Sequence, residues 1–279
     1  MKRDLGLSVK QPLENIFSSG YFNCIEFCIG ADFNVAGAFD DFYDKCNKVK
    51  ALCKKYNVKI NSYHLPYNGE RYEGYYMHAP SAFDKALRDK TLEYTKREIS
   101  ALLDTDIKFV VIHGSLRTPD EEREARVNNF VEYLKELCDF CAPHGITVAV
   151  ETLLECCIGG GGEDPENRIK EMKYIIENVK RDNIGICLDN NHFTKSSSID
   201  FVKELGQYVV TTHFSDYYGD RECHNIPGKG TTDWRELTRI LIEKGYKGPW
   251  LFEIRFKDLE VPTNEELAEL YDSWNKVTS

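Results

Sequence analysis

The sequence of 279 residues lacks several features that mark other classes of protein. No uninterrupted apolar run approaches the ~20 residues that a membrane-spanning helix needs, so we expect no membrane contact. The opening segment, MKRDLGLSVKQ, lacks the apolar stretch of a secretory signal. Basic residues are in the minority, and the net charge of −10 weighs against a broad nucleic-acid-binding face. With 42% hydrophobic and 29% charged residues, the composition is that of a folded globular chain.

The ten cysteines do not form the pattern of a disulfide framework or of a thiolate metal site. Cys138 and Cys141 have CxxC spacing, but no second CxxC follows, and they lie in the helical pattern FVEYLKELCDFC. Packing explains this pair better than metal binding. The adjacent Cys156 and Cys157 have no obvious partner. We therefore expect all ten thiols to be reduced and the protein to be cytoplasmic.

Short apolar runs of the strand kind alternate with longer amphipathic segments along the chain. The expected strands are Leu5–Val9, Asn23–Cys28, Lys59–His64, Lys108–His113, Thr147–Glu151, Gly185–Asp189, Val209–His213 and Trp250–Ile254. The main expected helices are Phe39–Tyr56, Ala82–Leu103, Glu121–Cys141, the segment that begins at Pro165, Trp234–Glu243 and Asn264–Val277. Alternation of this kind implies parallel strands joined by helical crossovers.

Eight such units in a chain of this length close most simply as an α/β protein of the (β/α)8 TIM barrel type. An open, doubly wound sheet is the alternative. It is disfavoured because no Gly-rich turn of the dinucleotide-binding kind follows the first strand, and GLSVKQP would not hold a pyrophosphate. No linker divides the chain, so we expect a single domain over residues 1–279.

Six consecutive expected strands end in a carboxylate or an imidazole. These side chains belong to His64, His113, Glu151, Asp189, His213 and Glu253. Two further polar residues, His192 and Asp216, follow three residues after a strand end. Because all strands of a barrel point their carboxyl ends to one mouth, we expect these side chains to converge there.

Each of these residues alone has an ordinary structural explanation, such as a helix cap at Asp189 or a hydrogen-bonded loop histidine at His64. Six in register favour a site, because clustered buried carboxylates are costly unless a cation or protons neutralise them. Two Glu, one Asp and one His form a mixed oxygen and nitrogen shell. Such a shell suits one divalent ion, Mn²⁺, Zn²⁺, Co²⁺ or Mg²⁺.

The sequence resembles the xylose-isomerase-like barrels, a family that includes sugar isomerases, ketose 3-epimerases, sugar phosphate isomerase/epimerases and endonuclease IV. The resemblance covers nearly the whole chain in strand order. It is most specific over VAVETL, ICLDNNH, THFSDYYGDRECHNIPGKGTTDW and PWLFEI.

In the epimerase branch a Glu, an Asp, a His and a second Glu hold the metal. The resemblance places these ligands at Glu151, Asp189, His213 and Glu253. It also implies that Glu151 and Glu253 are the acid/base pair, and that His192 and Arg221 bind substrate oxygens. The expected activity is isomerisation or epimerisation of a sugar or sugar phosphate by proton transfer through an enediolate.

Endonuclease IV, a zinc-dependent phosphodiesterase that cleaves at abasic sites, is the competing interpretation. The resemblance to that branch implies three zinc ions, early histidine ligands and an acid-x-His pair after the seventh strand. His64, His113, His192 and the Glu222-Cys223-His224 segment could supply them. Three features favour the sugar enzyme. The pair has Glu222 where the nuclease has Asp, the loop is short, and the DNA-facing loops show no Arg and Lys concentration. In sugar-active relatives, His64, His113 and His224 would bind substrate hydroxyls.

The segment PGKGTTDW after His224 admits two interpretations. A phosphate could sit on this Gly-rich turn, with Lys229 and the following helix N-terminus as partners. Alternatively, the glycines form a tight turn and Asp233 caps the helix.

Two further classes are weaker. A non-catalytic barrel is disfavoured because both acid/base glutamates are present. A hydride-shift isomerase is disfavoured because no lysine stands at a strand end in a matching position. The expected partner is a small-molecule sugar or sugar phosphate, and a homo-oligomer is compatible with the sequence.

Overall fold

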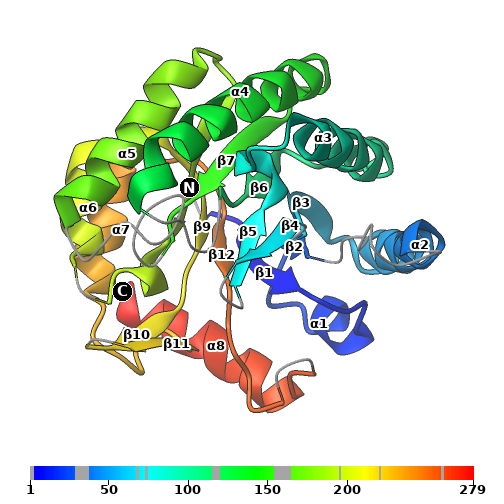
Figure 1. Cartoon of the computed structure of the whole chain (residues 1–279). Helices are drawn as coiled ribbons and strands as arrows, with labels where there is room; N and C mark the ends of the chain where they lie inside the picture. The colour runs from blue at the N-terminus through cyan, green and yellow to red at the C-terminus, as the bar shows by residue number, and fades with distance from the viewer. Residues whose placement is uncertain are drawn as a thin grey trace.

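The structure, a computed structural model, is a barrel of parallel strands surrounded by helices (Figure 1). It describes residues 3–28, 38–66, 69–72, 75–114, 120–153, 165–194, 196–219, 221–258 and 261–279. The barrel strands are β1 (Leu5–Val9), β2 (Cys24–Phe27), β3 (Lys59–His64), β6 (Phe109–Ile112), β7 (Thr147–Glu151), β8 (Ile184–Asp189), β9 (Val209–His213) and β12 (Trp250–Phe252). They pair in the order β12-β1-β2-β3-β6-β7-β8-β9. The predicted (β/α)8 barrel and its eight strands are confirmed.

The barrel is nearly closed between β9 and β12. Just past β9, the Phe214 N–H donates to the Leu251 carbonyl at 2.8 Å, and the Glu253 N–H donates to the Phe214 carbonyl at 3.3 Å. The Thr212 hydroxyl also accepts from the Leu251 N–H at 3.1 Å. These bonds join the last strand to the seventh barrel strand and bring Glu253 beside the end of β9.

Within the described ranges, eight α-helices cover the outside of the barrel (Figure 1). They are α1 (Glu14–Ser18), α2 (Ala38–Tyr56), α3 (Lys85–Ser100), α4 (Arg123–Cys141), α5 (Pro165–Val179), α6 (Ser198–Leu205), α7 (Trp234–Glu243) and α8 (Asn264–Val277). Side-chain caps fix several of their starts. Asp84 accepts from the Ala86 N–H, so α3 begins at Lys85 instead of the predicted Ala82. Thr263 and Glu266 form a capping box at α8.

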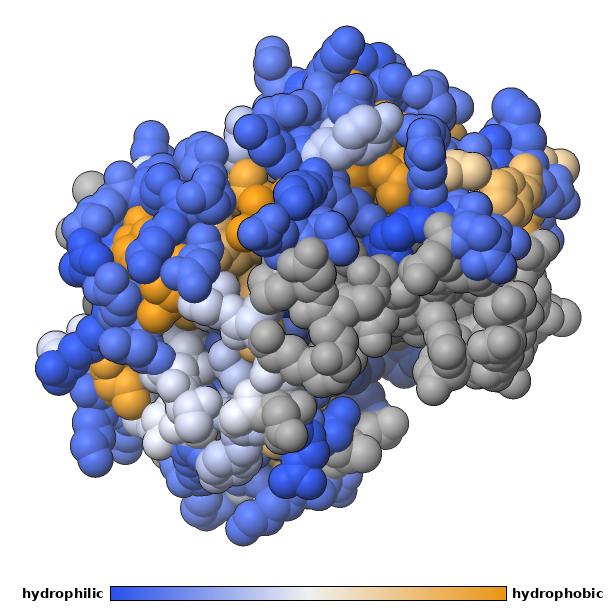
Figure 2. Space-filling view, turned by 60° about the vertical axis from the view of Figure 1, so that its left-hand side comes forward, coloured by the Kyte–Doolittle hydropathy of each residue, from blue (hydrophilic) through white to orange (hydrophobic). Residues whose placement is uncertain are grey.

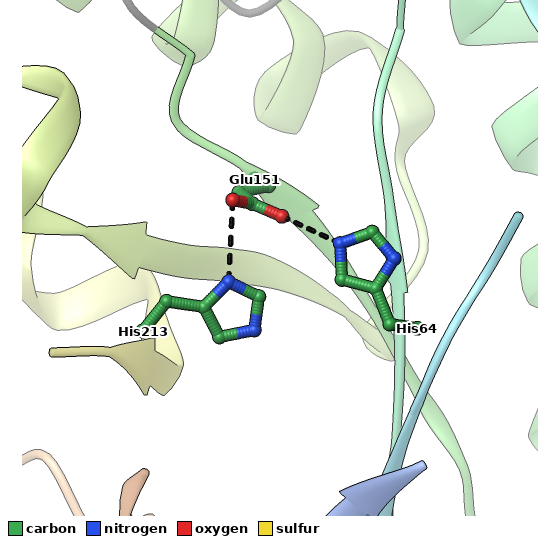
Figure 3. Close-up of side chains that lie close together, drawn as sticks. All are labelled: His64, Glu151 and His213. Carbon is green, nitrogen blue, oxygen red and sulfur yellow. Dashed lines mark hydrogen bonds and ion pairs between the residues drawn. The ribbon is translucent and has the colours of Figure 1, made fainter. Parts of the chain in front are cut away.

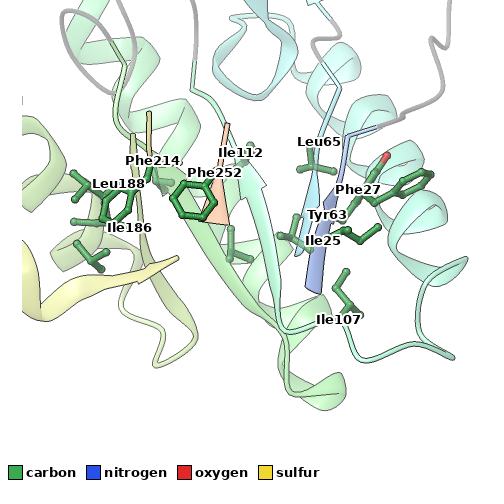
Figure 4. Packing of buried hydrophobic residues seen from close by; sticks show 14 of the residues in the cluster. Ile25, Phe27, Tyr63, Leu65, Ile107, Ile112, Ile186, Leu188, Phe214 and Phe252 are labelled. Carbon is green, nitrogen blue, oxygen red and sulfur yellow. The ribbon is translucent and has the colours of Figure 1, made fainter. Parts of the chain in front are cut away.

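The hydrophobic core has two parts. The larger part lies between strands and helices, where Phe27 and Tyr63 of neighbouring strands both pack on Phe42 of α2, with ring centroids 6.2 Å apart in each case. Figure 4 shows buried residues of this layer that lie in the barrel strands or next to them. The smaller part, inside the barrel, consists of fully buried, small side chains on β6, β7 and β8, namely Val111, Ala149 and Cys187. Because these side chains are small, they leave room for polar groups at the mouth of the barrel.

Two antiparallel hairpins were not predicted: β4 (Gly69–Tyr72) with β5 (Tyr75–His78), and β10 (Asp216–Tyr218) with β11 (Arg221–Asn225). Both lie in connections between barrel strands. In the second, Gly219 adopts a positive φ of 52° at the turn. The dipeptide Gly219-Asp220 in SDYYGDRECHN is therefore the sequence signal for this hairpin.

The eight cysteines that the structure describes are all free. Cys138 and Cys141 are buried on the face of α4 that packs against the core, as the sequence indicated. Burial raises the pKa of each thiol to about 12. Cys156 and Cys157 lie outside the described residues. No described helix has the length and apolar character that would let it cross a membrane. The face in Figure 2 is mostly hydrophilic, with hydrophobic residues in small separate groups.

Candidate active site

Strand alternation directs the polar residues to the mouth of the barrel. Successive side chains of a strand point to opposite faces, so residues two apart share a face. Ala149 lies inside the barrel, and Glu151 follows two residues later at the end of β7. Cys187 and Asp189 have the same relation in β8. Register completes the arrangement, since Asp189 is paired directly with His213 of β9.

Four of the predicted residues meet at this mouth. One ligand atom from each of Glu151, Asp189, His213 and Glu253 lies within 4.8 Å of the others. The nitrogen His213 Nδ1 is 3.2 Å from Glu151 Oε1 and 3.4 Å from Glu253 Oε2. Glu151, Asp189 and His213 are buried, whereas the side chain of Glu253 is 24% exposed. Residues about a hundred positions apart therefore share one small polar centre.

The second oxygen of Glu151 faces two more of the predicted histidines. His64 Nε2 is 3.0 Å and His113 Nε2 is 2.6 Å from Glu151 Oε2. Figure 3 shows the Glu151 carboxylate between His64 and His213. His64 Nδ1 lies 2.9 Å from the Leu65 carbonyl oxygen, which suits the tautomer that donates to this oxygen. Glu151 therefore lies at the centre of the site, with Oε1 near His213 and Oε2 near His64 and His113.

The surrounding imidazoles keep the glutamates ionised. Burial opposes ionisation of Glu151, but His113 and His213 hold its pKa well below the ordinary value. Burial likewise opposes ionisation of Glu253, yet His213 and His224 lower its pKa to about 2. Both groups are carboxylates at neutral pH and can accept a proton.

Asp189 offers the clearest evidence that the site suits a cation. Its Oδ1 accepts from the Asn191 N–H at 2.7 Å, whereas its buried Oδ2 accepts no hydrogen bond from any described residue. Burial raises the pKa of Asp189 to about 6. A buried carboxylate oxygen is costly to leave unpartnered, and a cation would satisfy it. The three carboxylates and one imidazole fit a divalent ion of the Mn²⁺, Co²⁺, Zn²⁺ or Mg²⁺ kind.

A second group adjoins the first at Asp189. Ligand atoms of Asp189, His192 and His224 also lie within 4.8 Å of one another. His192 Nε2 is 3.6 Å from Asp189 Oδ2. His224 Nε2 is 2.9 Å from Glu222 Oε1, so the acid-x-His pair of the hairpin is joined by a direct contact.

The comparisons with known proteins follow this geometry. Residues 13–276 match the family model described as xylose isomerase-like TIM barrel. The chain belongs to this family. Among solved structures, the D-psicose 3-epimerase of Clostridium cellulolyticum H10 is similar in fold, with a TM-score of 0.72 and 16% identity over 99% of each chain.

Several curated proteins are similar to this chain in sequence. The probable endonuclease 4 of Ureaplasma parvum is 27% identical over 81% of this chain and 75% of its own length. The fructoselysine 3-epimerase of Shigella flexneri is 24% identical over 72% of this chain and 70% of its own length. An uncharacterised Sinorhizobium fredii protein is 24% identical over 60% of this chain, and the match spans about half of that protein, 53%.

One predicted site residue of this xylose isomerase-like chain is not drawn into the cluster. Arg221 is exposed at the start of β11, and no described contact joins it to the glutamates. The side chain lies at the opposite end of this strand from His224, which does reach the site. Arg221 is three residues from His224 in the sequence, but this nearness does not bring its side chain into the cluster.

Two charged residues were missed in the sequence. Lys10 follows β1 directly, and its Nζ lies 3.9 Å from Glu253 Oε1, so a lysine does lie beside Glu253. Glu26 of β2 is fully buried with its Oε1 2.8 Å from His213 Nε2. The period of two would have found both. Gly6 and Ser8 of β1 and Lys10 just after it are spaced by two residues, and so are Cys24 and Glu26 of β2.

The Gly-rich segment is a tight turn, and the phosphate interpretation has no support in its contacts. The buried carboxylate of Asp216 accepts from the N–H groups of Gly228 at 2.7 Å and Thr232 at 3.1 Å. The Lys229 Nζ pairs with Glu269 at 2.5 Å. Asp233 accepts from the Glu236 N–H and caps α7, as the alternative interpretation expected. These donors are engaged within the protein.

Proposed function

We propose that this protein is a divalent-metal-dependent isomerase or epimerase of a sugar or sugar phosphate. The observation that carries the proposal is the placement of Glu151 and Glu253 at 3.2 and 3.4 Å from the same nitrogen, His213 Nδ1. Two ionised carboxylates at one centre provide a base and, after proton transfer, an acid. Reversible removal of a proton next to a carbonyl group needs this pair.

The residues have separate roles in the proposed reaction. One glutamate removes the proton from the carbon next to the carbonyl, and the other returns a proton. Return to the opposite face gives an epimer, and return to the neighbouring carbon gives the aldose–ketose isomer. His64, His113, His192 and His224 are proposed to contact substrate hydroxyls. Arg221 is proposed to bind substrate from the rim, since it shares β11 with His224.

Glu151, Asp189, His213 and Glu253 would hold one divalent ion. When bound, this ion would act as a Lewis acid that stabilises negative charge on neighbouring substrate oxygens. Asp189 Oδ2, which accepts no hydrogen bond from any described residue, supports this assignment.

The names of similar proteins support a sugar substrate. One curated relative is a fructoselysine 3-epimerase, and another, from Halalkalibacterium halodurans, is an inosose isomerase that is 30% identical over 53% of this chain and 54% of its own length. The first name describes an epimerisation and the second an isomerisation.

Solvent isotope exchange tests the proposed reaction before its substrate is known. The protein is incubated with Mn²⁺ and a panel of ketoses and ketose phosphates in deuterated water, and each sugar is examined by NMR. We expect deuterium at a carbon next to the carbonyl of at least one sugar. The exchange should need both the metal and Glu151. A panel that exchanges no faster than the protein-free control would contradict the proposal.

A second candidate is a phosphodiesterase of the endonuclease IV kind. A specific observation favours it: the groups His64–Glu151–His213 and Asp189–His192–His224 adjoin the four-residue site and offer places for further ions. Endonuclease 4 proteins are also among the similar sequences. Three zinc ions per chain, together with cleavage of a duplex that carries one abasic site, would establish this function in place of the first.

A further inference from the structure

Glu26 is a buried acid next to the proposed metal site that no role yet explains. It belongs to β2 and is fully buried. Its Oε1 lies 2.8 Å from His213 Nε2. It is not one of the four proposed ligands, because the His213 ring separates it from Glu151.

The carboxylate of Glu26 is fixed by its neighbours. The Ser62 hydroxyl donates to Oε2 at 2.9 Å, and the Cys28 thiol donates to Oε1 at 3.5 Å. Glu26 and Ser62 are directly paired residues of adjacent strands, so backbone register sets this contact. A buried carboxylate held by two donors on rigid strands has little freedom to turn away from His213.

The two nitrogens of His213 face different groups. Nε2 faces Glu26, and Nδ1 faces Glu151 and Glu253. An imidazole can ligate a cation through one nitrogen only when that nitrogen carries no proton, and a carboxylate on the other nitrogen favours this tautomer. We propose that Glu26 is a positioning residue that holds the proton on His213 Nε2 and so directs the Nδ1 lone pair at the metal. This inference rests on the proposed metal-dependent function.

The test compares Glu26→Gln and Glu26→Ala with the wild type. Glu26→Gln keeps the size of the side chain and guards against loss of folding. Glu98→Gln is the matched control, because Glu98 is also a buried glutamate but lies on α3, outside the barrel. Two quantities are measured on each protein. Equilibrium dialysis gives the Kd for Mn²⁺, and ¹⁵N NMR of the histidine rings gives the tautomer of His213, assigned by its loss in His213→Gln.

We expect Glu26→Ala to weaken Mn²⁺ binding by about 10- to 100-fold. Glu26→Gln should have an intermediate effect, and Glu98→Gln should match the wild type. In the wild type loaded with diamagnetic Zn²⁺, the Nε2-protonated tautomer of His213 should prevail. At the same Zn²⁺ concentration, both Glu26 variants should show a smaller population of this tautomer. Equal Mn²⁺ affinity and an unchanged tautomer in Glu26→Gln and Glu26→Ala would overturn the role of Glu26 alone. A wild type that binds no divalent ion would overturn the proposed function, and this inference with it.

Discussion

The ring of His213 lies between two buried carboxylates, with Nε2 2.8 Å from Glu26 Oε1 and Nδ1 3.2 Å from Glu151 Oε1. Burial opposes a charge on this ring, but Cys187, Glu26 and Glu151 raise the pKa of His213 well above its ordinary value. The acids around His213 therefore favour its protonated form. A divalent cation would replace that proton, so the affinity for metal would depend on the protonation of the cluster.

Asp189→Asn is expected to abolish stabilisation by metal without harming the metal-free fold. Asp189 Oδ2 is buried and accepts no hydrogen bond from any described residue, so removing its charge costs the metal-free protein little. In the wild type, metal at ~100 times its Kd should add about 2.7 kcal/mol of stability, roughly 5 °C in Tm. Thermal unfolding with and without Mn²⁺ measures both effects.

The control for Asp189→Asn is Asp233→Asn, a helix-cap change outside the cluster. This variant should keep the full Mn²⁺ shift in Tm. If Asp189→Asn kept the shift as well, Asp189 would not be a ligand.

Glu151→Gln and Glu253→Gln are each expected to lower kcat by about 10²- to 10⁴-fold, because each removes one of the two acid/base groups. Glutamine keeps the size of the side chain and one oxygen, so folding should survive. Turnover of the sugar identified by isotope exchange measures the loss. Full turnover by either variant would show that the assignment of the acid/base pair is wrong.

Asp216→Ala is expected to destabilise the protein by about 3 to 5 kcal/mol. The change would remove the acceptor for the Gly228 N–H, the Thr232 N–H and the Trp234 indole N–H, and a buried donor left unsatisfied costs about 1 to 3 kcal/mol. Asp216→Asn retains one acceptor oxygen and should cost less. Urea unfolding of the three proteins gives the values, and equal stability of Asp216→Ala and the wild type would contradict the structural role of Asp216.

Lys229→Ala is expected to change little. The Lys229 ammonium pairs with Glu269 on the surface, and such pairs contribute about 0.2 to 1 kcal/mol. If the substrate proves to be a sugar phosphate, KM for it should stay within about twofold of the wild type, an estimate that follows from the weak surface pair. A large rise in KM for the phosphorylated sugar alone would restore the phosphate interpretation of the Gly-rich turn.

The barrel strands were predictable because each apolar run ends where the sequence changes to polar residues. Apolar runs such as VAVE and ICLD stop at a carboxylate, and the strand bounds at β7 and the end of β8 agree with the prediction. The convergence of Glu151, Asp189, His213 and Glu253 followed from parallel topology, since every strand of a barrel ends at the same mouth.

Glu26, Lys10 and the position of Arg221 needed more than strand ends. Glu26 stands one residue before the end of β2, so a rule based on terminal residues passed over it. Lys10 comes after its strand, and only the closure of the barrel between β1 and β12 brings it to Glu253. Arg221 depended on a hairpin whose geometry the strand pattern does not encode.

The most direct test of the account is the position and number of metal ions in a crystal of the protein grown with Mn²⁺. Anomalous diffraction at the manganese edge would locate each ion. The account predicts one strong peak per chain, within ligand distance of Glu151, Asp189, His213 and Glu253. A mouth without a peak would contradict the proposed site, and additional peaks beside His64 and His113 and beside His192 and His224 would contradict the single-metal sugar enzyme in favour of a trinuclear phosphodiesterase.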